Sequence, residues 1–140
     1  MKHLFIINPA AGSRDQTESY RKKITEAFAD SDEEYIVEVS CAPGNCKELA
    51  RRAAETGEEY RIYACGGDGT LNEVVSGVAG YPNVAVTVFS GGSGNDFTRI
   101  FSEPEFEHYF GRRADKKRKF YNGKIKCDYY MFTDNARRKK

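Results

Sequence analysis

The stretch CGGDGTLNEVV, Cys65 to Val75, joins a strand pattern to a helix pattern. This junction is the strongest indication of the fold in the sequence. The mostly apolar residues 61–65 before its glycines predict a buried strand. After the glycines, apolar residues recur at the spacing of one helix face: Leu71, Val74, Val75 and Val78. Glycines at such a junction let the backbone approach an anion, and the helix N-terminus directs N–H groups at it.

Strand and helix patterns alternate on both sides of this stretch. Further strands are predicted at residues 5–7, 35–41 and 84–89, and helices at residues 15–30 and 46–54, with Gly57 as a C-terminal cap. This alternation predicts a three-layer, Rossmann-like α/β domain with a mainly parallel sheet. Later in the chain, residues 106–110 suggest a short helix and Asn122-Gly123 a hairpin.

Three loops are expected at the carboxyl ends of the strands, where such sheets bind ligands: residues 8–12, 66–70 and 90–96. Each combines small residues with Asn, Asp, Ser or Thr, and together they predict a site for a nucleotide phosphate chain. A single glycine loop would more often be just a tight turn. Neither the Walker A pattern nor the G-x-G-x-x-G pattern is present in them.

Asp68 is the unexpected residue in a phosphate loop, because a carboxylate repels phosphate unless Mg²⁺ intervenes or the side chain caps the helix. Three roles stay open from the residues alone. Asp68 orders the loop, meets a water molecule bound to magnesium, or faces the acceptor of the phosphate.

Composition sets broad limits. The 140 residues suffice for one domain, and no apolar run approaches the roughly 20 residues of a membrane-spanning helix. The few cysteines fit a reducing cytoplasm and are interpreted as buried small hydrophobic residues: Cys41, Cys46, Cys65 and Cys127.

Charge is distributed unevenly along the chain. Residues 112–140 hold twelve Lys or Arg and three Asp, for a net charge of +9, whereas the remainder carries −8. A basic segment on an acidic body suggests a phosphate-rich partner or surface. The alternative is a solvated terminus without a partner.

The three loops also resemble a known family. Gly66–Val74 resembles the signature of the diacylglycerol kinase catalytic domain and its bacterial lipid-kinase relatives. Residues 8–12 (Asn-Pro-x-x-Gly) resemble the family's N-terminal loop, and Gly92–Phe97 resembles its G-T-x-N-D-F segment, in the family's order. The resemblance implies the NAD kinase/diacylglycerol kinase-like fold. It also implies transfer of the ATP γ-phosphoryl group to a lipid hydroxyl, of diacylglycerol or a related lipid, with Mg²⁺ required.

The resemblance also assigns site residues. Asp68 and Asp96 would lie near the phosphates and the acceptor and organise metal or water, and no residue is assigned as a dedicated metal ligand. Asn72 and Glu73 could equally be ordinary residues of the first helical turn that face water. The residues that would bind the nucleotide are Asn8, Pro9, Ala10, Ala11, Gly12, Ser40, Gly66, Gly67, Asp68, Gly69, Thr70, Leu71, Asn72 and Ser93.

For domain organisation, we expect residues 1–120 to form a nucleotide-binding α/β domain. Residues 121–140 would be a basic segment leading towards an absent second, β-rich domain. In the family that domain contributes the general base and the lipid cleft, so the chain is expected to be incomplete as a catalyst. The resemblance further implies a cytoplasmic protein, peripheral at the inner membrane surface, with ATP and a lipid substrate as partners. An unpaired sheet edge would favour a homodimer.

Two other functions remain open. NAD kinases share a G-G-D-G-T loop, although their Asn-Glu pair belongs to a separate later segment, whereas here Asn72-Glu73 follows the loop directly. A non-catalytic nucleotide- or membrane-binding module with a basic tail is the second alternative. Sparse aromatic residues among the basic ones argue against nucleic acid as a partner.

Overall fold

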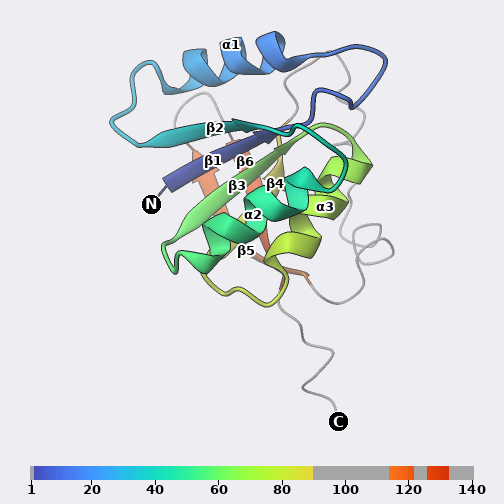
Figure 1. The fold of residues 1–140 in the computed structure, drawn as a ribbon. Helices are drawn as coiled ribbons and strands as arrows, with labels where there is room; N and C mark the ends of the chain where they lie inside the picture. The colour runs from blue at the N-terminus through green and yellow to red at the C-terminus, as the bar shows by residue number, and fades with distance from the viewer. Residues whose placement is uncertain (1, 90–113, 122–125, 133–140) are drawn as a thin grey trace.

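The computed structural model describes residues 2–89, 114–121 and 126–132 and has three layers (Figure 1). A six-stranded sheet is covered by helix α1 on one face and by α2 and α3 on the other. The helices are α1 (Thr17–Phe28), α2 (Asn45–Glu55) and α3 (Asp68–Val78). The strands are β1 (Lys2–Ile7), β2 (Tyr35–Val39), β3 (Tyr60–Cys65), β4 (Val84–Val88), β5 (Ala114–Tyr121) and β6 (Lys126–Phe132). The predicted α/β fold with a mainly parallel sheet is confirmed.

The strand order is β2-β1-β3-β4-β6-β5. The first four strands are parallel, and β6 runs antiparallel to both β4 and β5. Tyr121 pairs with Lys126, so the strands flank the hairpin that was predicted at residues 122–123, which themselves lie outside the described residues. Residues 126–132 of the predicted basic segment 121–140 form β6, which pairs between β4 and β5, and the predicted division into domains stays a prediction.

Alternation along the buried strands produces two separate cores, since successive side chains of a strand point to opposite faces. One core lies between the sheet and the pair α2 and α3, and it includes Leu4, Ile6, Ile62, Ala64, Val84 and Val86. The other lies under α1 and includes Phe5, Ile7, Tyr63, Cys65 and Ala85. Strand β1 is therefore buried on both faces, as expected for a central strand of a parallel sheet.

Helices α2 and α3 pack closely because small residues line their contact. A Cβ atom on Gly77 would lie 3.2 Å from the Cβ atom of Ala50 and would clash with the carbonyl oxygen of Lys47. No larger residue fits at position 77 without separating the helices. This contact fixes the position of α3, whose first turn includes residues 68–70 of the predicted ligand loop.

Several sequence predictions need correction. Helix α3 begins at Asp68, so residues 68–70 form its first turn instead of a loop. Cys46 and Cys65 are buried as predicted, but Cys41 is exposed because it follows the end of β2. Strand β2 lies at the sheet edge, which leaves Tyr35 and Ile36 exposed.

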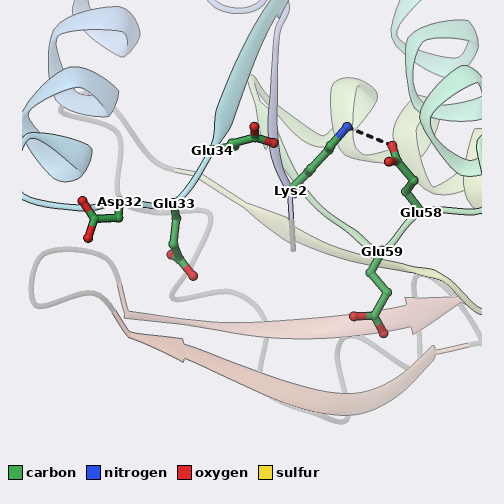
Figure 2. Close-up of a pocket in the computed structure, with 6 residues that line it drawn as sticks. All are labelled: Lys2, Asp32, Glu33, Glu34, Glu58 and Glu59. Atoms are coloured by element: carbon green, nitrogen blue, oxygen red, sulfur yellow. Dashed lines mark hydrogen bonds and ion pairs between the residues drawn. The ribbon is translucent and has the colours of Figure 1, made fainter.

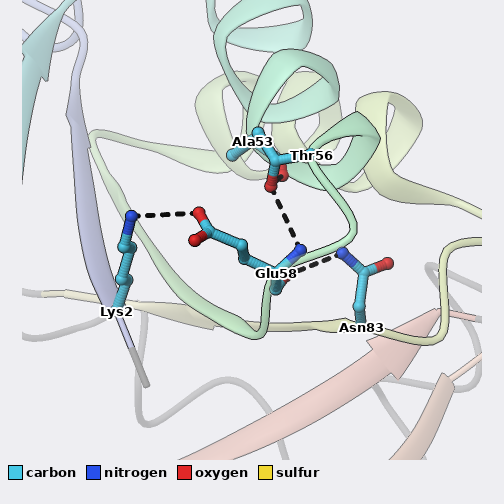
Figure 3. Close-up of polar contacts among 5 residues, drawn as sticks. All are labelled: Lys2, Ala53, Thr56, Glu58 and Asn83. Atoms are coloured by element: carbon cyan, nitrogen blue, oxygen red, sulfur yellow. Dashed lines mark hydrogen bonds and ion pairs between the residues drawn. The ribbon is translucent and has the colours of Figure 1, made fainter.

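A group of polar contacts lies in the turn between the end of α2 and the start of β3 (Figure 3). Thr56 Oγ1 donates to the carbonyl oxygen of Ala53 (2.7 Å) and accepts from the Glu58 amide (3.2 Å). Asn83 Nδ2 donates to the Glu58 carbonyl oxygen (2.8 Å), and Lys2 Nζ pairs with the Glu58 carboxylate (2.9 Å). The Thr56 hydroxyl thus adds a second donor to a carbonyl of the last turn of α2, and the Asn83 and Lys2 contacts hold the turn that leads to β3.

Among the residues that the structure describes, no helix is both long enough and apolar enough to cross a membrane.

Candidate functional site

The strand order creates a crevice at the carboxyl ends of β1 and β3. From the central β1 the chain passes through α1 on one face to β2, and then through α2 on the other face to β3. Loops that leave adjacent strands towards opposite faces of the sheet diverge from each other. In open α/β sheets, ligands bind at this point of divergence. The loops after β1 and β3 are the first two of the three loops predicted from sequence.

Asn8 connects the ends of three strands. Its Nδ2 donates to Thr70 Oγ1 on α3 (3.1 Å), and its Oδ1 accepts from the Ala10 amide (3.1 Å) and from Ser40 Oγ (3.5 Å) after β2. Its backbone N–H donates to the carbonyl oxygen of Cys65, the last residue of β3 (3.0 Å). One asparagine thus uses both its amide nitrogen and its amide oxygen to hold the loops in register.

A pocket of about 370 Å³ opens beside Asn8. Its walls are mainly small apolar groups, and its polar groups come from Asn8, Ser40 and Glu73. This combination of apolar walls with a few placed polar groups is typical of small-molecule sites. The residues that line it are Asn8, Pro9, Ala10, Ser40, Cys41, Ala42, Pro43, Gly69 and Glu73.

The structure brings together part of the predicted nucleotide site. Five predicted residues line the pocket: Asn8, Pro9, Ala10, Ser40 and Gly69. Ala11 and Gly12 continue the loop after β1, Gly66 and Gly67 precede α3, and Asp68 and Asn72 are exposed on α3. The side chains of Thr70 and Leu71 are buried. Ser93 and Asp96 lie outside the described residues, so their placement stays a prediction.

Thr70 and Leu71 help to build the site without facing solvent. Leu71 packs in the core beneath α2 and α3, and its N–H donates to the carbonyl oxygen of Gly67 (3.1 Å). Thr70 accepts from Asn8 and lies directly against Gly66. A Cβ atom on Gly66 would lie 2.8 Å from Thr70 Cβ and closer still to Oγ1, so glycine is required there by contact, not by backbone angle.

Sequence reasoning missed three of the lining residues and left the role of a fourth, Glu73, open. Cys41, Ala42 and Pro43 follow Ser40 directly and form one wall, and Glu73 adds a carboxylate from the second turn of α3. The position of Ser40 at the end of a predicted strand was a signal that its successors also reach the site. Glu73 and Gly69 are four residues apart, a spacing that puts both on one face of α3.

Glu73 is not simply a helix residue that faces water, one of the two readings left open for it. Its Oε1 accepts from the backbone N–H of Gly44, the residue that precedes α2 (2.7 Å). Burial raises the pKa of the Cys46 thiol, the nearby Glu73 carboxylate raises it further, and a Ser40 hydrogen bond opposes the shift. The Cys46 thiol therefore lies near the Ser40 hydroxyl and the Glu73 carboxylate, and the last two residues line the pocket.

A second, larger pocket of about 450 Å³ lies near the start of β1, before β2 and before β3 (Figure 2). Its lining has one lysine and five carboxylates: Lys2, Asp32, Glu33, Glu34, Glu58 and Glu59. Lys2 is already paired with Glu58 (2.9 Å). The remaining negative charge repels phosphates, and this pocket lies away from the carboxyl ends of the strands. Although this pocket is the larger of the two, its charge and its position do not suit a nucleotide.

Comparison with protein families matches residues 2–118 to the diacylglycerol kinase catalytic domain. The chain belongs to the diacylglycerol kinase catalytic domain family. It is similar to the Bacillus subtilis protein named "Putative lipid kinase YtlR", with 36% identity over 73% of this chain and 34% of that protein. It is also similar to a Bacillus subtilis diacylglycerol kinase, with 33% identity over 71% of this chain and 32% of that one.

Solved structures of the diacylglycerol kinase family agree. A diacylglycerol kinase crystal structure from Bacillus anthracis superimposes with a TM-score of 0.51 and 26% identity, over 71% of this chain and 37% of that one. The chain spans about a third of the length of the curated relatives it matches. The resemblance seen in the three loops is thus confirmed at the level of the family.

Proposed function

We propose that this chain binds ATP in the pocket beside Asn8 and serves a kinase that phosphorylates a lipid hydroxyl. The observation that carries the proposal is the junction between Asn8 and Thr70, because it joins two of the three predicted phosphate loops at the carboxyl ends of β1 and β3. The volume of about 370 Å³ lies within the range of small-molecule sites. Membership of the diacylglycerol kinase family supports the reaction class.

The nucleotide would use the two sides of the site differently. The apolar wall of Ala42 and Pro43 suits the base, and the start of α3 suits the phosphates. A Cβ atom on Gly67 or Gly69 would meet nothing within 4 Å, so the backbone there is open to close approach. The phosphates would then receive N–H groups and the positive end of the helix dipole.

The proposed Mg²⁺ would arrive with the nucleotide. The described residues contain no group of three or more His, Cys, Asp or Glu able to enclose a metal ion. Mg²⁺ is commonly held by one or two carboxylates together with substrate phosphates. Asp68, exposed on the first turn of α3, is the carboxylate that we propose for this contact or for a water molecule on the ion. When bound, Mg²⁺ would neutralise phosphate charge during transfer.

Calorimetric titration of the chain with ATP and Mg²⁺ tests binding. Protection of Cys41 from alkylation, followed by peptide mass spectrometry, tests its location, because Cys41 lines the pocket and is exposed. Cys46 and Cys65 provide internal controls. Both are buried, so their alkylation should be slow whether or not ATP is present. ATP binding without protection of Cys41 would move the nucleotide to another site.

The acceptor requires a separate experiment. Labelled ATP is incubated with diacylglycerol, a sphingoid base or NAD, using both this chain and a version extended by a β-rich catalytic partner domain from a relative. We expect lipid product, and only with the extended version, because the resemblance places the family's general base in the second, β-rich domain. Product from NAD alone would favour the NAD kinase alternative.

Membrane binding by the basic segment is the remaining alternative. Deleting residues 112–140 would remove β5 and β6 from the sheet, so that deletion cannot separate binding from folding. Replacing Arg137, Arg138, Lys139 and Lys140 with Gln leaves both strands in place. Reduced flotation of this variant with anionic liposomes would support a peripheral location at the membrane surface.

A further inference from the structure

Glu73 joins two elements that line the pocket, helix α3 and the segment before α2. It projects from the face of α3 that also carries Gly69, and both residues line the pocket. Its carboxylate accepts a hydrogen bond of 2.7 Å from the Gly44 amide, at the far end of the wall of residues 41–43. This bond spans 29 residues of sequence and crosses from α3 to the start of α2.

The start of α2 needs such a partner. The residue before it, Gly44, has no side chain and makes no side-chain cap, and its φ of +83° is a conformation that favours glycine. The first N–H groups of a helix have no partner within the helix and carry its positive dipole end. A carboxylate placed there satisfies an N–H donor and is itself stabilised by the dipole.

The same wall is fixed at its other end by separate contacts. The Cys41 amide donates to Asn45 Oδ1 (3.1 Å), and the Ser40 amide donates to the carbonyl oxygen of Ile7 (2.9 Å). Between these anchors, Ala42 and Pro43 present only apolar surface to the pocket. Glu73 therefore supplies the polar contact that ties the Gly44 end of the wall to α3.

We propose that Glu73 is a positioning residue, which caps α2 through the Gly44 amide and thereby sets the separation between the two walls of the pocket. The inference rests on the proposed ATP site and assigns Glu73 a role that does not require contact with the nucleotide. Because its charge is offset by the α2 dipole, Glu73 presents less repulsion to phosphates than a free carboxylate would. In this proposal the phosphates bind at the start of α3 and do not contact Glu73.

The test uses Glu73→Ala and Glu73→Gln in the 140-residue chain. Glu48→Ala is the matched control, because Glu48 is a solvent-exposed carboxylate on the first turn of α2 and does not line the pocket. Hydrogen exchange of the Gly44 amide, measured by NMR, reports the capping bond. Calorimetry reports the Kd for ATP.

In Glu73→Ala, exchange of the Gly44 amide should accelerate about tenfold to a hundredfold, as expected when a hydrogen bond to a charged group is lost. The Kd for ATP should rise about tenfold. Glu73→Gln keeps an acceptor oxygen, so it should restore most of the protection and most of the affinity. Glu48→Ala should leave both quantities near those of the parent chain.

Two results would overturn the inference. Unchanged Gly44 exchange in Glu73→Ala would show that the bond does not hold the wall. Slow exchange in Glu73→Gln combined with a Kd as weak as that of Glu73→Ala would show that the charge contacts the nucleotide directly. Failure of the parent chain to bind ATP would instead overturn the proposed function, while the exchange data would still decide whether Glu73 caps α2.

Discussion

Asn8 and Thr70 are 62 residues apart in sequence, yet Asn8 Nδ2 donates a hydrogen bond of 3.1 Å to Thr70 Oγ1. Thr70 is almost fully buried, so its hydroxyl would lack a water partner if Asn8 were absent. The bond joins the loop after β1 to the first turn of α3, which follows β3. A change at either residue should therefore affect both folding and binding.

Substitution of Asn8 separates these two effects. Asn8→Ala removes the donor that the buried Thr70 hydroxyl accepts from and should lower the free energy of unfolding by about 1–3 kcal/mol. Asn8→Asp keeps the shape and the acceptor oxygens, and the Thr70 hydroxyl can donate to the new carboxylate. It should therefore lose less stability, but the added charge should weaken ATP binding. Urea unfolding and calorimetry check the two quantities. Equal ATP affinity in Asn8→Asp and the parent chain would place the phosphates away from Asn8.

Gly66 and Gly67 should respond differently to alanine. Gly66→Ala forces a Cβ atom against the Thr70 side chain and should cost about 1–3 kcal/mol of stability. Gly67→Ala meets nothing within 4 Å, and the extended backbone there accepts alanine, so its stability should stay within about 0.5 kcal/mol of the parent. Urea unfolding of the matched pair measures the difference. Equal loss in both variants would contradict the contact explanation.

Gly69→Ala should weaken ATP binding without lowering stability. Gly69 lies inside the first turns of α3 with free space around it, so alanine should maintain stability or raise it by up to about 1 kcal/mol. The methyl group would project where the backbone lines the pocket, and ATP affinity should fall. Thermal unfolding and calorimetry on one sample check both effects. A variant that is both stable and fully competent to bind would exclude close approach at Gly69.

His3 should make stability depend on pH. It is fully buried, with Nδ1 2.9 Å from Tyr63 Oη and Nε2 3.0 Å from the Glu33 carboxylate. Burial lowers the pKa of His3 below 6.5, although Glu33 opposes this shift and Arg61 adds to it. The unfolded chain then binds a proton more readily than the folded chain. The free energy of unfolding should fall as pH drops below about 6.5, by at most about 1.4 kcal/mol per pH unit.

Urea unfolding between pH 7.5 and 5.5 measures this slope. His3→Gln removes the titrating ring and serves as the control, so the difference in slope between the two proteins isolates His3. Equal slopes would show that His3 does not contribute.

Local pattern was enough to predict most of the described fold. The helix predicted at residues 15–30 forms α1, and the apolar residues that recur in it at helical spacing, Tyr20, Ile24, Ala27 and Phe28, are its buried residues. Gly57 was predicted as the cap after α2, and it has a φ of +78° there. Patterns of this kind succeed because burial on one face of an element repeats with the period of that element. Pattern did not predict where α3 begins, since glycines are compatible with both a loop and a first helical turn.

The alternation of strands and helices, and the loops at the carboxyl ends of β1 and β3, could be predicted from the sequence because hydrophobic period and turn chemistry are local properties. The family was indicated by the resemblance of the three loop motifs. The burial of Thr70 and Leu71, the position of Cys41 in the pocket lining and the contact of Glu73 with Gly44 became known only from the three-dimensional structure. These facts depend on the strand order and on the close packing of α2 against α3, which bring together residues from separate parts of the chain.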